Sequence, residues 1–260
     1  MALTFALRGN SLTPLYAYDP RFAAYGAGVP SVIADAGAIG GYAIDQGVLG
    51  ALGQQRLHFG GIGNWSSVPS FSVLLRFYHY SAATSISLFS CVGGGRQGTF
   101  GQAAFQVSYD STNLKIGMGD ENALTGIASA TFAHGGLSSA TYYDLFITGT
   151  GDTTSSGFKV YLNSSLLGST TASRAWSNPR EKIHNALILG QCANAPNTYM
   201  RVNEFCLWDS IEDPTAILLE SGSGSLNGAS RTSFVAASAY NGLASSGGGL
   251  KRINNSYFGV

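Results

Sequence analysis

Charged residues are scarce in this chain, since Lys, Arg, Asp and Glu together make up 11% of its 260 residues, less than half the usual share. Fourteen basic residues balance fourteen acidic ones, and no basic run is longer than Lys251-Arg252. A nucleic-acid-binding protein needs a concentrated positive surface, so we expect no nucleic-acid partner. A surface with so few charges is poorly protected against association, which favours a protein that works bound to copies of itself or within a larger assembly.

Cysteines and long apolar runs are also scarce. Cys91, Cys192 and Cys206 are too few for a disulfide framework and lack the spacing of a zinc site, so we expect free thiols. No apolar stretch is long enough to span a bilayer, which predicts no membrane partner. The short apolar stretch at the N-terminus precedes Arg8, unlike the order in a signal peptide. We therefore expect no secretory route and no glycosylation of sequons such as Asn163-Ser164-Ser165.

What the sequence has instead is glycine, at 35 residues, and apolar residues that alternate with polar ones. Segments 71–80, 142–148 and 158–163 each place apolar side chains on one face with a period of two, which predicts β-strands. Further strands are predicted at 3–7, 56–59, 85–90, 104–109, 114–118, 186–190, 201–207 and 233–237, with a weaker one at 41–44. Many short strands separated by Gly, Ser, Asn and Asp indicate an antiparallel sandwich or barrel. One short helix is predicted from Asp213 and Pro214 to Gly222.

Three segments taken together resemble the laminin-G-like and concanavalin A-like lectin/glucanase group. They are FSVLLRFYHY at 71–80, YYDLFITGTGDTTSSGFKVYLNSSLLGS at 142–169, and ALILGQ at 186–191 followed by YMRVNEFCLWDSIEDPTAI at 199–217. The resemblance covers roughly 56–220 and implies a two-sheet jelly-roll sandwich. Two positions depart from the group: Ser164 stands where the hairpin turn usually has Gly, and Asn203 stands where Asp is common. The second departure argues against a metal-ligand strand there.

Catalytic and metal-binding patterns do not emerge. Hydrolases of this group carry two or three carboxylates on one strand, and glycoside hydrolysis needs two carboxyl groups about the scissile bond. Here Asp144 and Glu204 are single acids on separate predicted strands, so we expect no enzyme. Calcium needs six to eight oxygen ligands; it is the one cofactor left open, with its candidate ligands among the loop acids Asp110, Asp120, Glu121 and Asp152.

The outward face of three predicted strands is the candidate site. If strands 71–80, 142–148 and 158–163 share a sheet, as the resemblance implies, one face gathers Arg76, Tyr78, Tyr80, Tyr142, Asp144, Phe146, Lys159 and Tyr161. Aromatic rings interleaved with hydrogen-bonding groups suit a sugar ring or a protein partner. The alternative is that this face is covered, by segment 8–55, by the C-terminal tail or by a neighbouring subunit.

Together these observations predict an all-β, concanavalin A-like sandwich at 56–220. A strand and loop segment at 1–55 packs on it, and a C-terminal arm at 221–260 carries apolar residues. The leading hypothesis is a non-enzymatic virion structural protein, a capsid decoration or fibre component of a phage. It would be assembled in the host cytoplasm, with copies of itself and other virion proteins as partners. The alternative is a carbohydrate- or receptor-binding adhesion module, and a degenerate glycoside hydrolase is the third.

Overall fold

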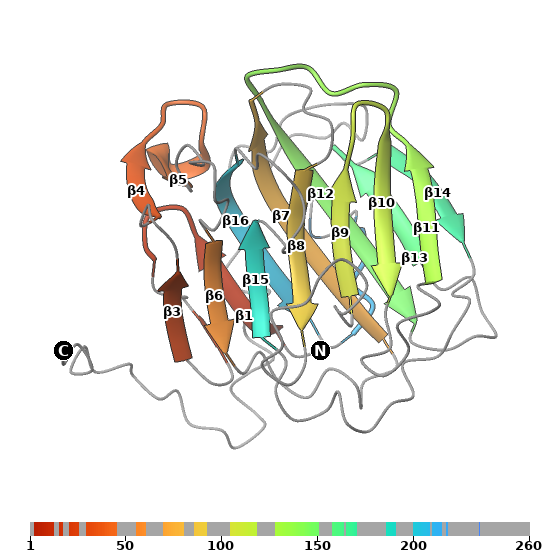
Figure 1. The fold of residues 1–260 in the computed structure, drawn as a ribbon, viewed down its shortest axis with the longest axis horizontal. Helices are drawn as coiled ribbons and strands as arrows, with labels where there is room; N and C mark the ends of the chain where they lie inside the picture. Colours follow the sequence, from red (N-terminus) through yellow and green to blue (C-terminus); the bar gives the residue numbers. More distant parts are fainter. Residues whose placement is uncertain are drawn as a thin grey trace.

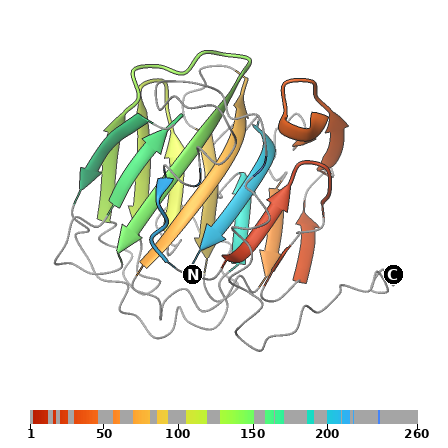
Figure 2. The same ribbon diagram turned by 180° about the vertical axis from the view of Figure 1, so that it is seen from behind.

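The computed structural model is a sandwich of two antiparallel β-sheets (Figures 1 and 2). The structure describes residues 3–12, 16–17, 21–25, 30–45, 56–60, 70–80, 86–92, 105–118, 128–150, 158–163, 165–170, 186–190, 200–208, 210–214, 217 and 234. The predicted all-β class and two-sheet antiparallel architecture are confirmed. The predicted strand at 233–237 and the end of the predicted helix lie outside the described residues, apart from Phe234.

The first sheet has nine strands. Its main path runs β14-β13-β12-β7-β16-β1-β2, while β5 pairs with β16 and β4 pairs with β5. The strands are β1 (Leu3–Arg8), β2 (Tyr16–Ala17), β4 (Ser31–Ala34), β5 (Tyr42–Asp45), β7 (Ser70–His79), β12 (Thr141–Thr150), β13 (Phe158–Leu162), β14 (Ser165–Thr170) and β16 (Met200–Trp208). A 3₁₀ turn, η1 (Ile39–Gly41), joins β4 to β5.

The second sheet has seven strands in the order β11-β10-β9-β8-β15-β6-β3. They are β3 (Arg21–Tyr25), β6 (Arg56–Gly60), β8 (Ile86–Val92), β9 (Phe105–Tyr109), β10 (Asn113–Met118), β11 (Ala128–Ala133) and β15 (Ala186–Gly190). Residues before position 56 thus supply strands to both sheets, β1, β2, β4 and β5 to the first and β3 to the second.

The main core lies between the sheets, where the alternation predicted it. The apolar residues of the three alternating segments are in this core, with Phe71, Val73, Leu75, Phe77, Tyr143, Leu145, Ile147, Phe158 and Val160 all buried. They meet side chains of the second sheet such as Leu88, Val107 and Ile116. Buried apolar surface is the dominant favourable term in folding, so this period of two fixes which face of β7, β12 and β13 points outward.

The hairpin between β13 and β14 turns at Asn163. Leu162 pairs with Ser165, which leaves a two-residue connection, and Asn163 has a positive φ of 47°. Asn is among the few residues that adopt this conformation readily. The Asn163 side chain also accepts a hydrogen bond from the Asp144 backbone N–H at 2.9 Å. The turn is therefore tied to β12.

Candidate binding site

The outward face of β7, β12 and β13 holds the predicted residues in one sheet. Tyr78 pairs with Tyr142 and Arg76 with Asp144 across the β7–β12 ladder, and Phe146 pairs with Tyr161 across the β12–β13 ladder. Lys159 lies on β13 and is exposed. The three strands are therefore neighbours, as expected.

Part of this face is not available to any partner, which corrects the prediction for three of its residues. Arg76, Asp144 and Phe146 are 4%, 4% and 0% exposed. The physical reason is that the chain covers its own sheet, at the Phe146 end with the segment after β16, which belongs to the predicted sandwich and not to the terminal segments expected as cover. At one end of the face, Phe146 packs in a second apolar cluster with Ala6, Leu74, Cys206, Trp208 and Ile217.

The covering segment follows β16 and crosses the sheet (Figure 2). Ser72 on β7 donates its hydroxyl to the Ser210 carbonyl at 2.8 Å and accepts the Glu212 N–H at 2.8 Å. Pro214 and Ile217 are helical, and the Ile217 N–H donates to the Asp213 carbonyl at 3.0 Å. The first turn of the predicted helix is thus present, and Ile217 from it packs on the second apolar cluster.

The middle of the face carries four ionisable residues with alternating charge on four neighbouring strands. The register places Arg8 of β1 beside Glu204 of β16, Glu204 beside Arg76 of β7, and Arg76 beside Asp144 of β12. The Arg76 guanidinium donates to the Asp144 carboxylate at 2.9 Å, with both side chains 5% exposed. Arg76 thus lies between Asp144 and Glu204 in the strand register, and it forms an ion pair with Asp144. They do not face a common open cleft, as glycoside hydrolysis requires.

The other end of the face is different, because its aromatic rings are half-buried. The β4–β5 turn and the β11–β12 connection lie at this end, the upper end in Figure 1. Three tyrosines gather there around one arginine of β16. The guanidinium carbon of Arg201 lies 5.0 Å from the ring centroids of both Tyr78 and Tyr80. The Tyr78 ring meets the Tyr80 and Tyr142 rings edge to face, with centroid distances of 4.9 and 5.1 Å.

Two carboxylates complete this tyrosine–arginine cluster, which we define as Asp35, Asp45, Tyr78, Tyr80, Tyr142 and Arg201. Asp35 Oδ2 accepts hydrogen bonds from the Tyr142 hydroxyl and from Arg201, both at 2.8 Å. Asp45 Oδ2 lies 3.5 Å from Arg201 Nε and accepts the Tyr80 hydroxyl at 3.3 Å. Each acid comes from the β4–β5 hairpin, so the cluster fastens this hairpin to the sheet.

Tyr78 is the central ring of the cluster and differs from the other two tyrosines. Among the residues that the structure describes, none forms a hydrogen bond with its hydroxyl, whereas the hydroxyls of Tyr80 and Tyr142 are held by Asp45 and Asp35. The Tyr78 side chain is half-buried. A ring with a hydroxyl at its edge presents both an apolar surface and a hydrogen-bonding group.

Three acidic groups of the cluster have shifted pKa values. Burial, and after it the Asp45 carboxylate, raises the pKa of Tyr80 to about 12. Burial and the hydrogen bond to Asp35 also raise the pKa of Tyr142. Burial opposes ionisation of Asp35, but hydrogen bonds from Tyr142, Arg201 and the Gly37 N–H outweigh it and lower the Asp35 pKa. Asp35 is therefore ionised, and Tyr80 and Tyr142 stay neutral.

The sequence missed Arg201, Asp35 and Asp45. Arg201 lies more than 120 residues from Tyr78, and only strand pairing brings them together. A usable signal was present at Asn203, where Asp was expected. The Asn203 amide donates to the carbonyls of Ile39 and Tyr42 at 3.0 and 2.8 Å, and its oxygen accepts the Ile39 N–H at 3.1 Å. A carboxylate could not donate, so Asn at this position marks a strand that holds the turn before β5.

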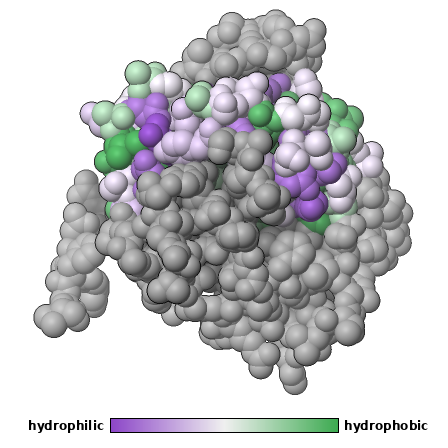
Figure 3. All heavy atoms as spheres, turned by 45° about the horizontal axis from the view of Figure 1, so that its top comes forward, coloured by the Kyte–Doolittle hydropathy of each residue, from purple (hydrophilic) through white to green (hydrophobic). Residues whose placement is uncertain are grey.

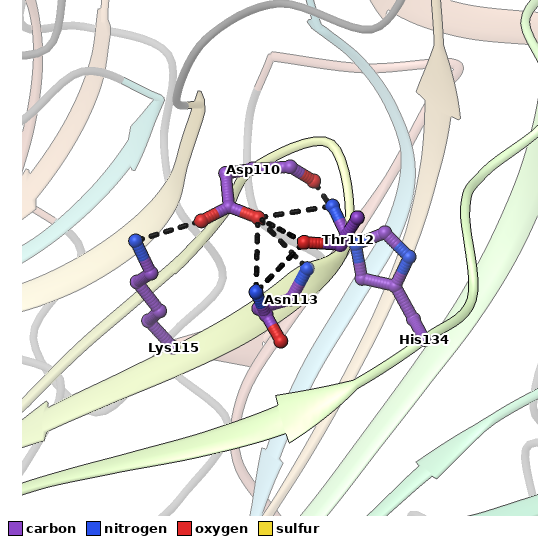
Figure 4. A network of polar contacts seen from close by, with 5 residues as sticks. All are labelled: Asp110, Thr112, Asn113, Lys115 and His134. Carbon is purple, nitrogen blue, oxygen red and sulfur yellow. Dashed lines mark hydrogen bonds and ion pairs between the residues drawn. The ribbon is translucent and has the colours of Figure 1, made fainter.

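A second polar network lies at the same end, in the β9–β10 turn (Figure 4). Asp110 Oδ1 accepts the backbone N–H groups of Thr112 and Asn113 at 3.0 and 2.8 Å, and Oδ2 forms an ion pair with Lys115 at 2.7 Å. His134 Nε2 lies 3.0 Å from the Asp110 carbonyl. The Lys115 contact, and then the Thr112 and Asn113 N–H groups, lower the Asp110 pKa. This is the geometry of a turn that is closed by its own side chain.

The calcium prediction rests on four acids, of which the structure describes only Asp110. Asp120, Glu121 and Asp152 lie outside the described residues, and Asp110 is paired with Lys115. Within the described part of the chain, no three His, Cys, Asp or Glu side chains are grouped to hold a metal ion. Calcium therefore stays a prediction.

Polar residues are prominent on this end of the sandwich. Figure 3 brings the end forward and shows hydrophilic residues in two areas of the described surface.

None of the described helical residues belongs to a helix long and apolar enough to cross a membrane.

Comparison with known proteins finds likeness in fold and none in sequence: no family and no curated protein matches the chain. Among solved structures, the binding domain of botulinum neurotoxin DC in complex with rat synaptotagmin II is similar, with a TM-score of 0.59 and 13% identity over 82% of this chain. The same binding domain in complex with SialylT has a TM-score of 0.58 at 13% identity and 82% coverage. A structure of botulinum neurotoxin type C, whose cell entry depends on two ganglioside molecules, has a TM-score of 0.55 at 14% identity and 82% coverage.

In each of these three cases the chain spans about half of the neighbour, 49% of its length. At such low identity the likeness establishes the fold alone. Two of these neighbours are described as binding domains, and the likeness agrees with the two-sheet β-sandwich expected from the sequence.

Proposed function

We propose that this chain is a non-enzymatic adhesion module that binds a carbohydrate through the tyrosine–arginine cluster. The observation that carries the proposal is the set of three half-buried tyrosine rings beside Arg201, two of which are held by carboxylates that also bind Arg201. Rigid aromatic rings with fixed polar neighbours are what a sugar ring needs, because its C–H face packs on an aromatic ring and its hydroxyls need oriented hydrogen-bonding partners. The carboxylates and the hairpin turn hold the rings before a ligand arrives, which reduces the entropy lost on binding.

The solved neighbours lend support of a limited kind. One is in complex with SialylT, one depends on two ganglioside molecules for cell entry, and one is in complex with rat synaptotagmin II. A fold does not determine a function, so the argument rests on the cluster. The virion structural role, the virion localisation and the self-association predicted from the sequence stay predictions.

The test is a printed oligosaccharide array probed with the full chain and with a Tyr78→Ala/Tyr142→Ala variant. We expect binding to a restricted set of glycans that the double variant loses, while Lys159→Ala, at an exposed position on the same sheet face but outside the cluster, still binds. Near-ultraviolet circular dichroism of each variant checks that the fold is retained. Binding that is equal in the wild type and in a folded double variant would overturn the proposal.

A second arm of the array separates a sugar from a protein receptor. It carries glycoproteins before and after enzymatic removal of their glycans. The proposal expects binding to fall when the glycans are removed. Binding that survives deglycosylation would indicate a protein receptor and would overturn the carbohydrate proposal.

A further inference from the structure

We infer that the ligand of the tyrosine–arginine cluster is a neutral saccharide without an acidic group, and that Tyr78 contacts it directly. This inference rests on the proposed carbohydrate-binding function and narrows its ligand class. It is carried by the charge of the cluster and by the position of Tyr78 within it.

The charge of the cluster argues against an anionic sugar. Asp35 and Asp45 contribute two negative charges and Arg201 one positive charge, so the cluster sums to minus one. Arg201 is the positive group at this position, and both carboxylates already engage it, at 2.8 and 3.5 Å. Its guanidinium also lies over two tyrosine rings. An incoming carboxylate would therefore meet two like charges and an arginine that is already neutralised, and like charges at close range repel.

The nearest other arginine does not change this balance. The Arg76 guanidinium packs on the Tyr142 ring, with its carbon 5.0 Å from the ring centroid. Asp144 pairs with it at 2.9 Å, and both side chains are 5% exposed. A ligand at the surface cannot replace Asp144 without opening the sheet face. Arg201 in the cluster and Arg76 beside it are thus each already paired with a carboxylate.

Tyr78 is the residue best placed to contact a neutral sugar. Its ring lies between the Tyr80 and Tyr142 rings, and its hydroxyl has no hydrogen-bond partner among the described residues. A tyrosine hydroxyl donates one hydrogen bond and accepts others, which matches a sugar hydroxyl in either direction. The hydroxyls of Tyr80 and Tyr142 are already donated to carboxylates. Tyr78 therefore has hydrogen-bonding capacity that its neighbours have used.

The experiment measures binding of the full chain to matched oligosaccharides. Each pair consists of a neutral oligosaccharide and the same oligosaccharide with a terminal sialic acid, immobilised at equal density. The variants are Tyr78→Phe, which removes only the hydroxyl, and Tyr42→Phe, a matched control because Tyr42 is 47% exposed and lies outside the cluster. A third variant, Asp45→Asn, removes one negative charge.

The inference expects wild-type binding to the neutral member of a pair at least tenfold tighter than to its sialylated partner. Tyr78→Phe should weaken neutral binding by about fivefold, the effect of one neutral hydrogen bond, and Tyr42→Phe should leave it unchanged. Asp45→Asn should reduce the difference in affinity between the neutral and the sialylated oligosaccharide of a pair. Lower ionic strength should widen it in the wild type, because salt screens exposed charges.

The outcomes separate this inference from the proposed function. Cluster-dependent binding that favours sialylated members would overturn the neutral ligand and leave the carbohydrate-binding function standing. Neutral binding that Tyr78→Phe and Tyr42→Phe weaken equally, or not at all, would overturn the role of Tyr78. If no oligosaccharide of either kind binds, both the inference and the proposed function fail.

Discussion

Arg201 and Tyr78 are direct partners in the β16–β7 ladder, and the Arg201 guanidinium carbon lies 5.0 Å from the centroid of the Tyr78 ring. The same guanidinium binds Asp35 in the β4–β5 turn and Asp45 at the end of β5. One arginine thus links the central strands of the sheet to a hairpin at its edge. The aromatic site and the position of this hairpin therefore depend on each other.

Replacing Arg201 should loosen the hairpin and leave the centre of the sheet intact. In Arg201→Ala, we expect faster hydrogen exchange at the β4–β5 amides and unchanged exchange in β7 and β12, since local opening depends on local contacts. Because the Arg201 ion pairs are partly exposed, the free energy of global unfolding should fall by about 1 kcal/mol. Lys159→Ala, whose side chain is exposed, is the control. Equal acceleration throughout the nine-stranded sheet would contradict a local role.

The buried pair of Arg76 and Asp144 should matter more for stability than any surface charge. Asp144→Ala leaves Arg76 buried without its carboxylate and should lower the free energy of unfolding by about 3–5 kcal/mol. The double variant Arg76→Met/Asp144→Leu removes both charges and should lose far less, because apolar replacements avoid an unpaired charge. Denaturant unfolding of the three proteins measures this. A double variant as unstable as Asp144→Ala would show that the unpaired charge is not the cause.

The structure describes one residue of the C-terminal arm, Phe234. Two adjacent glycines allow its packing to be tested, because only one of them lies close to its ring. Phe234 lies over Arg8, with 4.7 Å from the guanidinium carbon to the ring centroid. A Cβ at Gly40 would come within 2.8 Å of the Phe234 ring, whereas a Cβ at Gly41 would meet no atom within 4 Å. Both glycines have positive φ, 74° and 76°. Gly41→Ala should therefore cost about 1–2 kcal/mol for φ alone, and Gly40→Ala should cost more.

A double-mutant cycle tests whether the additional cost of Gly40→Ala over Gly41→Ala comes from the Phe234 ring. In a Phe234→Ala background, Gly40→Ala and Gly41→Ala should destabilise the protein equally, because the crowded ring is gone. Thermal unfolding of the five variants and the wild type provides the comparison. If Gly40→Ala keeps its larger cost without the Phe234 side chain, then this contact does not dock the arm on its own domain.

His79 should make stability depend on pH in the mildly acidic range. Its Nδ1 lies 2.7 Å from the Tyr109 hydroxyl, and its ring is 1% exposed. Burial, and to a lesser degree His134, lowers the pKa of His79 below its ordinary value of 6.5. The unfolded chain therefore binds a proton at this residue first as the pH falls. Stability is full above about pH 6.5 and declines below it, until the pH reaches the folded-state pKa, with a limiting slope of about 1.4 kcal/mol per pH unit.

Measuring the free energy of unfolding between pH 8 and pH 5 tests whether stability falls as the pH falls. His79→Gln should be less stable at pH 8, and its stability should fall less between pH 8 and pH 5 than that of the wild type. His134→Gln serves as the comparison, since it removes a neighbouring imidazole and keeps His79. A slope that is unchanged in His79→Gln would assign the pH dependence to other groups.

The strands with clear alternation could be predicted from the sequence, and several without it could not. In β7 and β12 the apolar residues fall on one face because that face is the core, so the period of two is visible in the letters. Strands β3 and β11 are short and rich in Ala, and β4 pairs with β5 at an edge with mostly exposed side chains. Such strands form because a neighbouring strand offers hydrogen bonds, and the local sequence does not record this.

The tyrosines of the candidate site were predictable from two alternating segments, and its charged residues were missed for a similar reason. Tyr78, Tyr80 and Tyr142 were found because they occupy the polar phase of alternating segments. The prediction could not tell that Phe146 is covered by Ile217 while Tyr78 remains half-buried. That distinction depends on where the segment after β16 crosses the sheet. Asp35 was missed because it lies in a turn, where a single acid has no periodic pattern.

The measurement that tests the central claim most directly is a nuclear magnetic resonance titration. The full chain, with isotopically labelled tyrosines, is titrated with the neutral oligosaccharide that binds best on the array. The account predicts that the ring signals of Tyr78, Tyr80 and Tyr142 shift with the ligand and saturate together, while those of the core residues Tyr109 and Tyr143 do not. Shifts confined to tyrosines outside the cluster, with the signals of Tyr78 unmoved at saturation, would contradict it.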